Sequence, residues 1–364
     1  MLERFYVAEQ DQVRVSDYDL RSVVTQIFES MGVPPEDAAI GADTLIQTDL
    51  RGVETHGVSN MLRQYMELFR TGALNPKPEW KVLREFPGTA AIDGDRGLGV
   101  IQGPQAMQMA IEKARTVGVG VVAMQNSGHL GAVGHHAMLA AQQDMVGMCM
   151  TAGHLRAAPT FGKEMRLGTN PISFAAPARK EPFVLFDAAM TTIARNKITI
   201  AKRLGAQLEP GWVADADGQP IMEHVTVPDN DTFQLLLLGA TREGGSHKGY
   251  GLAMMVEVLA TLLSGSRPFM VDNTTLSKHY FAAYNIAAFT DVDEFKDTMD
   301  KMLRALQDTP PAEGHSRVLY PGLPEYENEA ERREHGIPLH REVVEWFDGV
   351  TNELGLDRLR RRNG

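Results

Sequence analysis

Apolar residues recur at helical spacing in three stretches near the start of the chain. The first stretch, residues 16–32, opens with a Ser-x-x-Asp capping pattern and stops at a glycine, so we predict an amphipathic helix there. The second helix is predicted from a first-turn proline over residues 35–50, and the third over residues 58–70. The pattern therefore predicts that the first 86 residues are helical.

The pattern changes after residue 87, where short apolar runs alternate with helical spacing. Strands are predicted over residues 89–92, 120–124, 146–150, 172–175 and 183–186, and helices over residues 104–116, 132–143, 248–263, 294–306 and 341–354. This alternation favours an α/β or α+β fold. We expect a mixed-sheet domain over residues 87–289 and a discontinuous helical domain formed by residues 1–86 with 290–364.

Composition and charge then limit the classes of function. The 364 residues are 43% hydrophobic, and 36 basic against 47 acidic side chains give a net charge of −11. A mean field of this sign repels phosphate, so we expect no general binding of nucleic acid or anionic lipid, although a local pocket can still bind a small anion. The single cysteine, Cys149, excludes an internal disulfide framework and a cysteine-based zinc site.

No stretch of the sequence is typical of a membrane span or an export signal. The first 16 residues carry charged side chains throughout, without an apolar core. The longest apolar stretch, Leu252 to Leu263, contains Glu257 and is too short to cross a bilayer. We therefore expect a cytoplasmic protein.

One glycine-rich segment carries the strongest candidate for chemistry. Residues 126–136 read Asn-Ser-Gly-His-Leu-Gly-Ala-Val-Gly-His-His and join a predicted strand to a helix. The ordinary pKa of histidine, about 6.5, suits proton exchange with an alcohol or carbonyl oxygen, so we favour catalysis by His129 over a hydrogen-bonded turn histidine. His135 and His136 are adjacent on the predicted helix and point apart, so we predict no metal site.

Three further segments have a structural and a functional interpretation each. His56 lies between two helices, where it is a functional group or, with Thr55, a cap for free helix amides. Lys248 follows a glycine-rich loop at a helix start, which favours an anion site over a flexible linker. Asp187 ends a predicted strand, where it accepts a hydroxyl hydrogen bond or caps a turn.

The sequence does not contain the dinucleotide-binding fingerprint of the Rossmann fold. Residues 97–103 come close to Gly-x-Gly-x-x-Gly but are one residue too long, and residues 118–120 lack the third glycine. A nicotinamide enzyme made from this chain would need another fold.

In this order and spacing the motifs resemble the malate/L-lactate dehydrogenase family, whose members bind nicotinamide without a Rossmann fold. The family includes ureidoglycolate dehydrogenase, sulfolactate dehydrogenase and piperideine-2-carboxylate reductase. The resemblance runs from about residue 16 to about residue 354. The matching stretches are residues 50–58, 128–131, 168–177, 187–197 and 248–265.

The resemblance implies hydride transfer between NAD or NADP and C2 of a small 2-hydroxy or 2-oxo acid, or the related imine. It implies a helical domain built from both chain ends, a mixed-sheet cofactor domain and a homodimer. His129 matches the acid–base histidine, His56 a second active-site histidine, and Thr55 a neighbouring residue that holds substrate. The implied cofactor contacts are Asp187, Ala188, Ala189, Lys248, Pro321 and Gly322.

Departures from the family pattern bear on the substrate. Asn60 stands where the family has an arginine that pairs with substrate carboxylate, and an amide cannot make a bidentate ionic contact. Basic candidates for that task are Arg63, His154 and Arg156; the alternative, which we favour slightly, is a neutral substrate group facing Asn60. Gly153 stands where relatives carry a side chain that touches cofactor. We therefore expect weak activity on plain malate and lactate.

Three other functions stay open on the sequence. A cyclic imine carboxylate reductase would share the family's fold. A metal-dependent hydrolase would use the histidine-rich middle of the chain. A non-catalytic sensor would bind a nucleotide without turning over a substrate.

Overall fold

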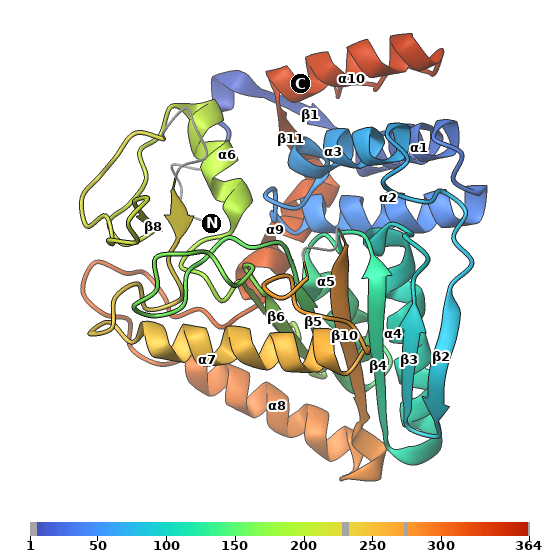
Figure 1. The fold of residues 1–364 in the computed structure, drawn as a ribbon, viewed down its shortest axis with the longest axis vertical. Coiled ribbons are helices and arrows are strands. Elements are labelled where there is room, and N and C mark those ends of the chain that lie inside the picture. The colour runs from blue at the N-terminus through green and yellow to red at the C-terminus, as the bar shows by residue number, and fades with distance from the viewer. Residues whose placement is uncertain (1–5, 228–232, 273–275, 363–364) are drawn as a thin grey trace.

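A seven-stranded mixed sheet forms the centre of the computed structural model, which describes residues 6–227, 233–272 and 276–362 (Figure 1). The strand order is β2-β3-β4-β10-β5-β6-β7. β3 and β4 are parallel, and the other neighbours are antiparallel. The strands are β2 (Lys81–Phe86), β3 (Thr89–Asp93), β4 (Val119–Ser127), β5 (Met145–Ala152), β6 (Ile172–Ala176), β7 (Val184–Ala188) and β10 (Ser277–Asn285).

Strand β10 lies at the centre of the seven-stranded sheet, although it is the last of these seven strands in sequence. It pairs with both β4 and β5, so that Phe281 lies opposite Val122 on one side and Cys149 on the other. Its side chains alternate between two buried cores. Phe281 packs in the core with helices α4 (Gly99–Val117) and α5 (Val133–Ala141), whereas Tyr280 packs in the core with α7 (Ser246–Val256) and the π-helix η3 (Glu257–Leu262). Helices thus cover both faces of the sheet.

The two ends of the chain build a second layer together (Figure 1). Its core contains α1 (Asp17–Ser30), α2 (Pro35–Leu50), α3 (Val58–Arg70) and α10 (Arg341–Leu354). Strand β1 (Gln12–Val15) pairs antiparallel with β11 (Ile337–His340), which joins the termini directly. Ser16 caps α1 by accepting a hydrogen bond from the Asp19 N–H (3.0 Å), as the capping pattern predicts.

The remaining elements lie around these layers. They are η2 (Glu9–Asp11), α6 (Arg195–Leu204), β8 (Val213–Ala214), β9 (Gln234–Leu235), η4 (Ile286–Ala288), α8 (Val292–Gln307) and α9 (Leu323–His335). Asp300 of α8 accepts hydrogen bonds from the N–H groups of residues 179–181 (3.0–3.2 Å), which fixes the turn between β6 and β7.

The predicted fold class is confirmed, with corrections to single elements. The prediction that residues 1–86 are wholly helical is wrong, because β1 and β2 lie among them. The helix predicted over residues 104–116 begins at Gly99 and contains Pro104. That proline leaves the Val100 carbonyl without its helical donor, and the Thr44 hydroxyl donates to it instead (2.8 Å).

The helix predicted over residues 248–263 is also modified. It starts at Ser246, and residues 257–262 form the π-helix η3. The division into two domains stays a prediction, although β2 joins residues 81–86 to the sheet. Across the described residues, the helices are all too short or too polar to cross a bilayer.

Candidate active site

His129 lies in the turn between β4 and α5, and two donors hold its Nδ1 atom. The Tyr65 hydroxyl lies 2.7 Å from Nδ1, and the Gly131 N–H donates to the same atom at 3.1 Å. Tyr65 belongs to the buried face of α3 and has no exposed surface. The helical layer therefore contributes a fixed hydroxyl to a histidine that stands at the edge of the sheet.

His56 stacks on His129. The ring centroids are 5.6 Å apart and the planes differ by 9°. The Thr55 hydroxyl lies 2.8 Å from His56 Nδ1, and Asn196 of α6 donates to the Thr55 carbonyl at 2.7 Å. The structure thus brings together the three residues that the resemblance assigns to the reaction: His129, His56 and Thr55.

Burial keeps both rings neutral. It lowers the pKa of His129 to about 3, with a smaller contribution from His56 and other nearby histidines, and it lowers the pKa of His56 to about 4. Burial raises the pKa of Tyr65 well above its ordinary value, so its hydroxyl keeps its proton and can donate. A neutral imidazole whose Nδ1 accepts hydrogen bonds carries its hydrogen on Nε2, which leaves Nε2 for a substrate atom.

A second histidine fixes the backbone on which His129 stands. His279 of β10 is fully buried, and its Nε2 lies 3.0 Å from the Gly128 carbonyl. Its Nδ1 lies 2.7 Å from the Thr151 hydroxyl, which donates when Nε2 carries the hydrogen. The central strand thus holds the residue directly before His129.

The start of α3 corrects the interpretation of Thr55 or His56 as a helix cap. The Val58 N–H donates to Asp49 Oδ2 (2.8 Å), so a buried aspartate from α2 supplies the acceptor. A Cβ atom on Gly57 would lie 1.8 Å from Asp49 Oδ1, which makes a side chain at residue 57 impossible without a shift. Burial raises the pKa of Asp49 to about 7.

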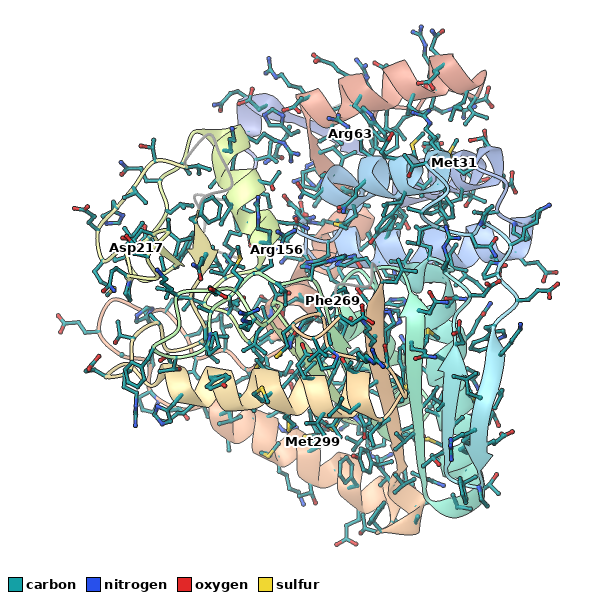
Figure 2. The ribbon with its side chains drawn as sticks, in the orientation of Figure 1. Met31, Arg63, Arg156, Asp217, Phe269 and Met299 are labelled. Carbon is teal, nitrogen blue, oxygen red and sulfur yellow. The ribbon has the colours of Figure 1, made fainter. Side chains whose placement is uncertain are left out.

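Of the predicted substrate contacts, His154 lies near His129 and Arg63 does not. His154 lies close enough to depress the pKa of His129, and its ring is 4.7 Å from that of Phe269. Arg63 lies over the Trp346 ring of α10 (5.2 Å), and two residues along a helix rotate the side chain by about 200° from Tyr65. Figure 2 shows Arg63 between α3 and α10, far from Phe269.

The hydrogen bonds of the Asn60 side chain and of the Arg156 backbone are with residues other than His129 and His56. The Asn60 amide donates to the Glu54 carbonyl (2.6 Å), and its oxygen accepts from Arg203 of α6 (3.3 Å). Arg156 is exposed in the loop after β5, and its backbone N–H and carbonyl bond to residues 167 and 235. Asn60 is therefore tied to the protein by both ends of its amide.

The predicted cofactor contacts of β7 and the later loop lie next to each other. The Gly134 N–H at the start of α5 donates to Asp187 Oδ2 (2.7 Å), and the Leu185 N–H donates to the Pro321 carbonyl (3.0 Å). Gly322 has φ +99°, and a Cβ there would lie 2.7 Å from the Leu185 nitrogen. Desolvation by the surrounding protein raises the pKa of the Asp187 carboxyl to about 6, although part of the side chain is exposed to solvent.

The loop before Lys248 is joined to the end of β7 by hydrogen bonds. The Leu238 N–H donates to the Met190 carbonyl (2.9 Å), and Gly249 packs on the Leu238 backbone. The Lys248 side chain is exposed at the first turn of α7. At Gly153 an added Cβ would meet no atom within 4 Å, so space remains beside that backbone.

This donor set fits a nicotinamide dinucleotide. A carboxylate such as Asp187 can accept ribose hydroxyl bonds, and an exposed lysine at a helix start suits a diphosphate. Ala188 and Ala189 follow Asp187 with small side chains, and no atom lies within 4 Å of a Cβ added at Gly153.

Sequence reasoning missed several residues of this site. Tyr65 carries the one signal that could have been found: a tyrosine on the apolar stripe of a predicted amphipathic helix. His279, Asn196 and Asp49 act through elements whose neighbours are distant in sequence, and the sequence carries no local signal for them.

A metal centre finds no support in the described ranges. No group of three His, Cys, Asp or Glu side chains there could hold a metal ion. The His135 and His136 rings are nearly perpendicular, at 88°, and His136 Nε2 lies 2.9 Å from the Leu130 carbonyl.

Comparisons with known proteins agree with this geometry. The model of the malate/L-lactate dehydrogenase family matches residues 15–347. Malate dehydrogenase of Pyrococcus abyssi is 37% identical over 99% of each chain, and L-sulfolactate dehydrogenase of Methanocaldococcus jannaschii is 36% identical over 93% of this chain and 96% of its own. The solved malate dehydrogenase of Pyrococcus horikoshii OT3 superposes with a TM-score of 0.87 at 34% identity, covering 97% of this chain and 99% of its own.

Proposed function

We propose a function from one premise: the chain belongs to the malate/L-lactate dehydrogenase family and is an oxidoreductase acting on CH–OH groups. We propose that it transfers a hydride between NAD or NADP and C2 of a small 2-hydroxy or 2-oxo acid, or a derivative of one. The observation that carries this proposal is the hydrogen bond between Tyr65 and His129 Nδ1, which leaves Nε2 for the reacting oxygen.

In the proposed reaction His129 moves the proton. A nicotinamide cofactor, when bound, would supply or accept the hydride at the substrate's C2. During oxidation the neutral ring takes the hydroxyl proton on Nε2, which requires its own hydrogen to stand on Nδ1 and to be donated to the Tyr65 oxygen. During reduction the doubly protonated ring returns the Nε2 proton to the substrate oxygen. A hydroxyl can both donate and accept, so Tyr65 donates to Nδ1 of the resting ring, whose hydrogen is on Nε2, and accepts from Nδ1–H of the ring that reacts.

Because His129 is buried, its protonation requires a negative charge nearby. The pKa of His129 is lowered to about 3 mainly by burial, so the ring gains a proton only when a negative charge accompanies it. The carboxylate of a 2-hydroxy acid supplies such a charge. We assign substrate contacts to Thr55, His56 and His154, which lie around His129.

Asn60 supports a substrate other than plain malate or lactate. It offers no cation, and both ends of its amide are engaged by Glu54 and Arg203. Asn60 itself cannot form an ion pair with a carboxylate, whereas a neutral amide or hydroxyl group needs no cation. Arg156 is the remaining predicted arginine that could hold a carboxylate from another direction.

We place the cofactor along Asp187, Ala188, Ala189, Gly153, Lys248, Pro321 and Gly322. If Lys248 contacts its phosphate or ribose, Lys248→Ala should weaken cofactor binding about ten- to a hundredfold, since a hydrogen bond to a charged group contributes roughly 1.5–3 kcal/mol. Quenching of intrinsic fluorescence by NADH and NADPH measures the affinity. Lys202→Ala, an exposed lysine of α6, is the matched control. Equal affinity in both variants would remove Lys248 from the site.

We further propose a cytoplasmic homodimer. The homodimer is supported by an apolar strip on α7 and η3, where Leu252, Met254, Met255, Val258 and Leu262 are exposed. A second copy of the chain would cover such a strip. Light scattering on the purified protein should give twice the chain mass of 40.0 kDa.

One panel experiment tests the proposed reaction. Purified protein is supplied with 2-oxo acids, 2-hydroxy acids and cyclic imines, and each is followed by cofactor absorbance with both nicotinamides. Turnover of a 2-oxo acid derivative above malate and lactate supports the proposal, and exclusive turnover of imines replaces it with an imine reductase. Cofactor binding without any turnover favours a sensor, and a stoichiometric bound metal favours a hydrolase.

A further inference from the structure

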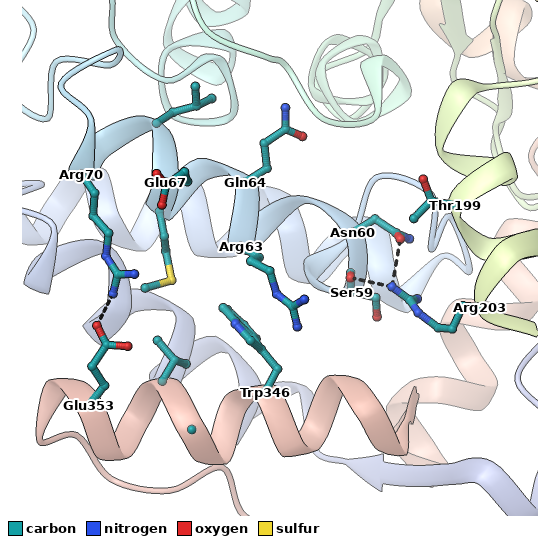
Figure 3. A pocket seen from close by; sticks show the side chains of 14 residues that line it. Ser59, Asn60, Arg63, Gln64, Glu67, Arg70, Thr199, Arg203, Trp346 and Glu353 are labelled. Carbon is teal, nitrogen blue, oxygen red and sulfur yellow. Dashed lines mark hydrogen bonds and ion pairs between the residues drawn. The ribbon is translucent and has the colours of Figure 1, made fainter. Parts of the chain in front are cut away.

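A cavity of about 820 Å³ opens between α3, α6 and α10, outside the site around His129 (Figure 3). Arg63 enters it from α3, Arg203 from α6, and Trp346 from α10. Since Tyr65 and Arg63 leave α3 in nearly opposite directions, the helix separates this cavity from His129.

The cavity is lined by three arginines, Arg63, Arg70 and Arg203, and by two acids, Glu67 and Glu353, so the positive charges exceed the negative ones by one. At one end Arg70 pairs with Glu353 (2.6 Å), so both are neutralised there. The contact of Arg63 within the described chain is aromatic rather than acidic: its guanidinium lies 5.2 Å from the Trp346 ring centre. A positive charge therefore faces the cavity without an acidic partner in a protein whose net charge is −11.

Arg203 adds a second positive charge to the same cavity. Its guanidinium donates to the Ser59 carbonyl and to Asn60 Oδ1, both at 3.3 Å. The nearest acid, Glu342, is 3.7 Å away and half exposed, so it screens the charge weakly. Burial lowers the pKa of Arg203, the charge of Glu342 raises it, and the charge of Arg63 lowers it by less, so the two guanidinium groups lie close enough to repel each other.

We propose that this cavity is a binding site for a small metabolite that carries a carboxylate or phosphate group. The anion lies between Arg63 and Arg203, because planar guanidinium groups bind such oxygens through paired hydrogen bonds. The organic part of the ligand lies over Trp346. Next to it Gly349 has no side chain, and a Cβ there would meet no atom within 4 Å, so the floor is open.

Asn60 lines this cavity and is also the proposed substrate contact, so a ligand bound here acts on the substrate site through that residue and is an effector. Arg203 bonds to Asn60, and Asn60 bonds to the Glu54 carbonyl, one residue before Thr55. An anion that draws Arg203 toward itself competes with these bonds. Its binding should therefore alter the start of α3, and with it turnover, without excluding substrate.

Calorimetric titration with inorganic phosphate and with succinate, at constant ionic strength, tests the site. We expect at least one of the two anions to bind with a Kd of about 1 mM or tighter, and the preferred anion identifies the group recognised. Arg63→Gln should weaken this binding about tenfold or more, because it removes a charge-assisted contact. Arg70→Gln, on the same helix and in the same cavity, should change it less than about twofold, because Glu353 already neutralises Arg70.

The outcomes are separable from those of the proposed reaction. Equal losses in the two variants, wild-type affinity in Arg63→Gln, or no binding of either anion overturns the site. Binding at the site around His129 would not depend on Arg63. If the anion binds but changes turnover only by competing with substrate, the effector role is wrong. A protein that turns over no substrate in the panel can still be titrated, so the two proposals fail independently.

Discussion

The two faces of α3 show how differently one helix can serve two kinds of chemistry. On the buried face Tyr65 donates to His129 in a setting where burial keeps Tyr65, His129 and His56 neutral. On the opposite face Arg63 keeps its charge beside Trp346 and solvent. The apolar face of α3 positions a proton through the short hydrogen bond between Tyr65 and His129. The solvent-exposed face carries the charged side chain of Arg63.

The difference follows from the cost of burying a charge. An ion loses its hydration when it is buried, so a buried histidine loses its proton and a buried tyrosine keeps its own. A hydrogen bond in this setting is strong and fixes a single arrangement. A surface guanidinium keeps most of its hydration, and its ion pairs contribute little to stability.

The largest effect we expect is a loss of folding stability in acid, caused by the histidines that are buried in the neutral form. Histidines that are neutral in the fold have lowered pKa values, near 3 or 4, against about 6.5 when unfolded. The unfolded chain then binds more protons, so stability rises with pH up to about 6.5 and is lost as the pH falls below it, at up to about 1.4 kcal/mol per unit and histidine. They are His56, His129, His135, His136 and His279.

Urea unfolding between pH 7.5 and 5 measures this slope. Four carboxyls oppose it, because a raised pKa gives stability that is lost as the pH rises through the folded value: Asp49, with a pKa of about 7, Asp187, with a pKa of about 6, Glu54 and Glu257. The five histidines outnumber these four carboxyls, so the net slope should be positive below about pH 6.5. A free energy of unfolding that is flat or rises as the pH drops would contradict the neutral assignment.

Removing the imidazole should cost most of the activity while leaving the fold. His129→Ala should lower kcat about a hundredfold or more, the usual range for general acid–base catalysis. Cofactor affinity should change little, because the assigned cofactor contacts lie elsewhere. Single-turnover rates with the best substrate of the panel, together with fluorescence titration of NADH, give both numbers. A variant that turns over like the wild type would exclude His129 as the acid–base group.

Removing only the hydroxyl on the buried face should have a smaller effect. Tyr65→Phe keeps the ring in its packed position but removes the donor to His129 Nδ1, so we expect kcat to fall about tenfold, the worth of one hydrogen bond in a closed site. The pH dependence of kcat should shift as well, because the ring loses its proton-holding partner. Tyr18→Phe, at an exposed tyrosine of α1, is the control. No difference between the two variants would reduce Tyr65 to a packing role.

The smallest effect should come from the exposed face. Arg63→Ala removes one partly exposed cation–π contact, which contributes about 0.5–1 kcal/mol. The free energy of unfolding at pH 7 should fall by no more than that. A loss of several kcal/mol would mean that Arg63 is structurally buried in a way that the fold does not indicate.

Local patterns in the sequence predicted what depends on neighbours along the chain. The helices of the N-terminal layer follow from apolar spacing and caps, such as Ser16 on α1. The segment around His129 stands out because glycines surround a histidine at the end of a strand. For the same reason the resemblance could be stated from short stretches alone.

What the sequence did not predict depends on distant partners. Strand β10 carries Lys278, His279 and Tyr280 among its buried residues, so it lacks the apolar run of a central strand. Strands β1 and β11 pair across more than three hundred residues, and neither has a turn signal that announces the other. Helix α9 is mostly charged and shows no apolar period. Arg63 was assigned to substrate from its spacing, but only the position of α10 shows where it points.

The central place of β10 sets an order of events during synthesis. A ribosome that has released residues up to 276 has already made β4 and β5, but each still presents an unpaired edge, because the strand between them has not yet emerged. Unpaired edges attract other strands, so the nascent chain is most exposed to aggregation at this stage. β4 and β5 become part of one sheet only when β10 has emerged and pairs with both. Strand β10 also carries His279. The backbone around His129 therefore acquires its support in the last quarter of translation, and protease resistance of stalled nascent chains should rise sharply only past residue 285.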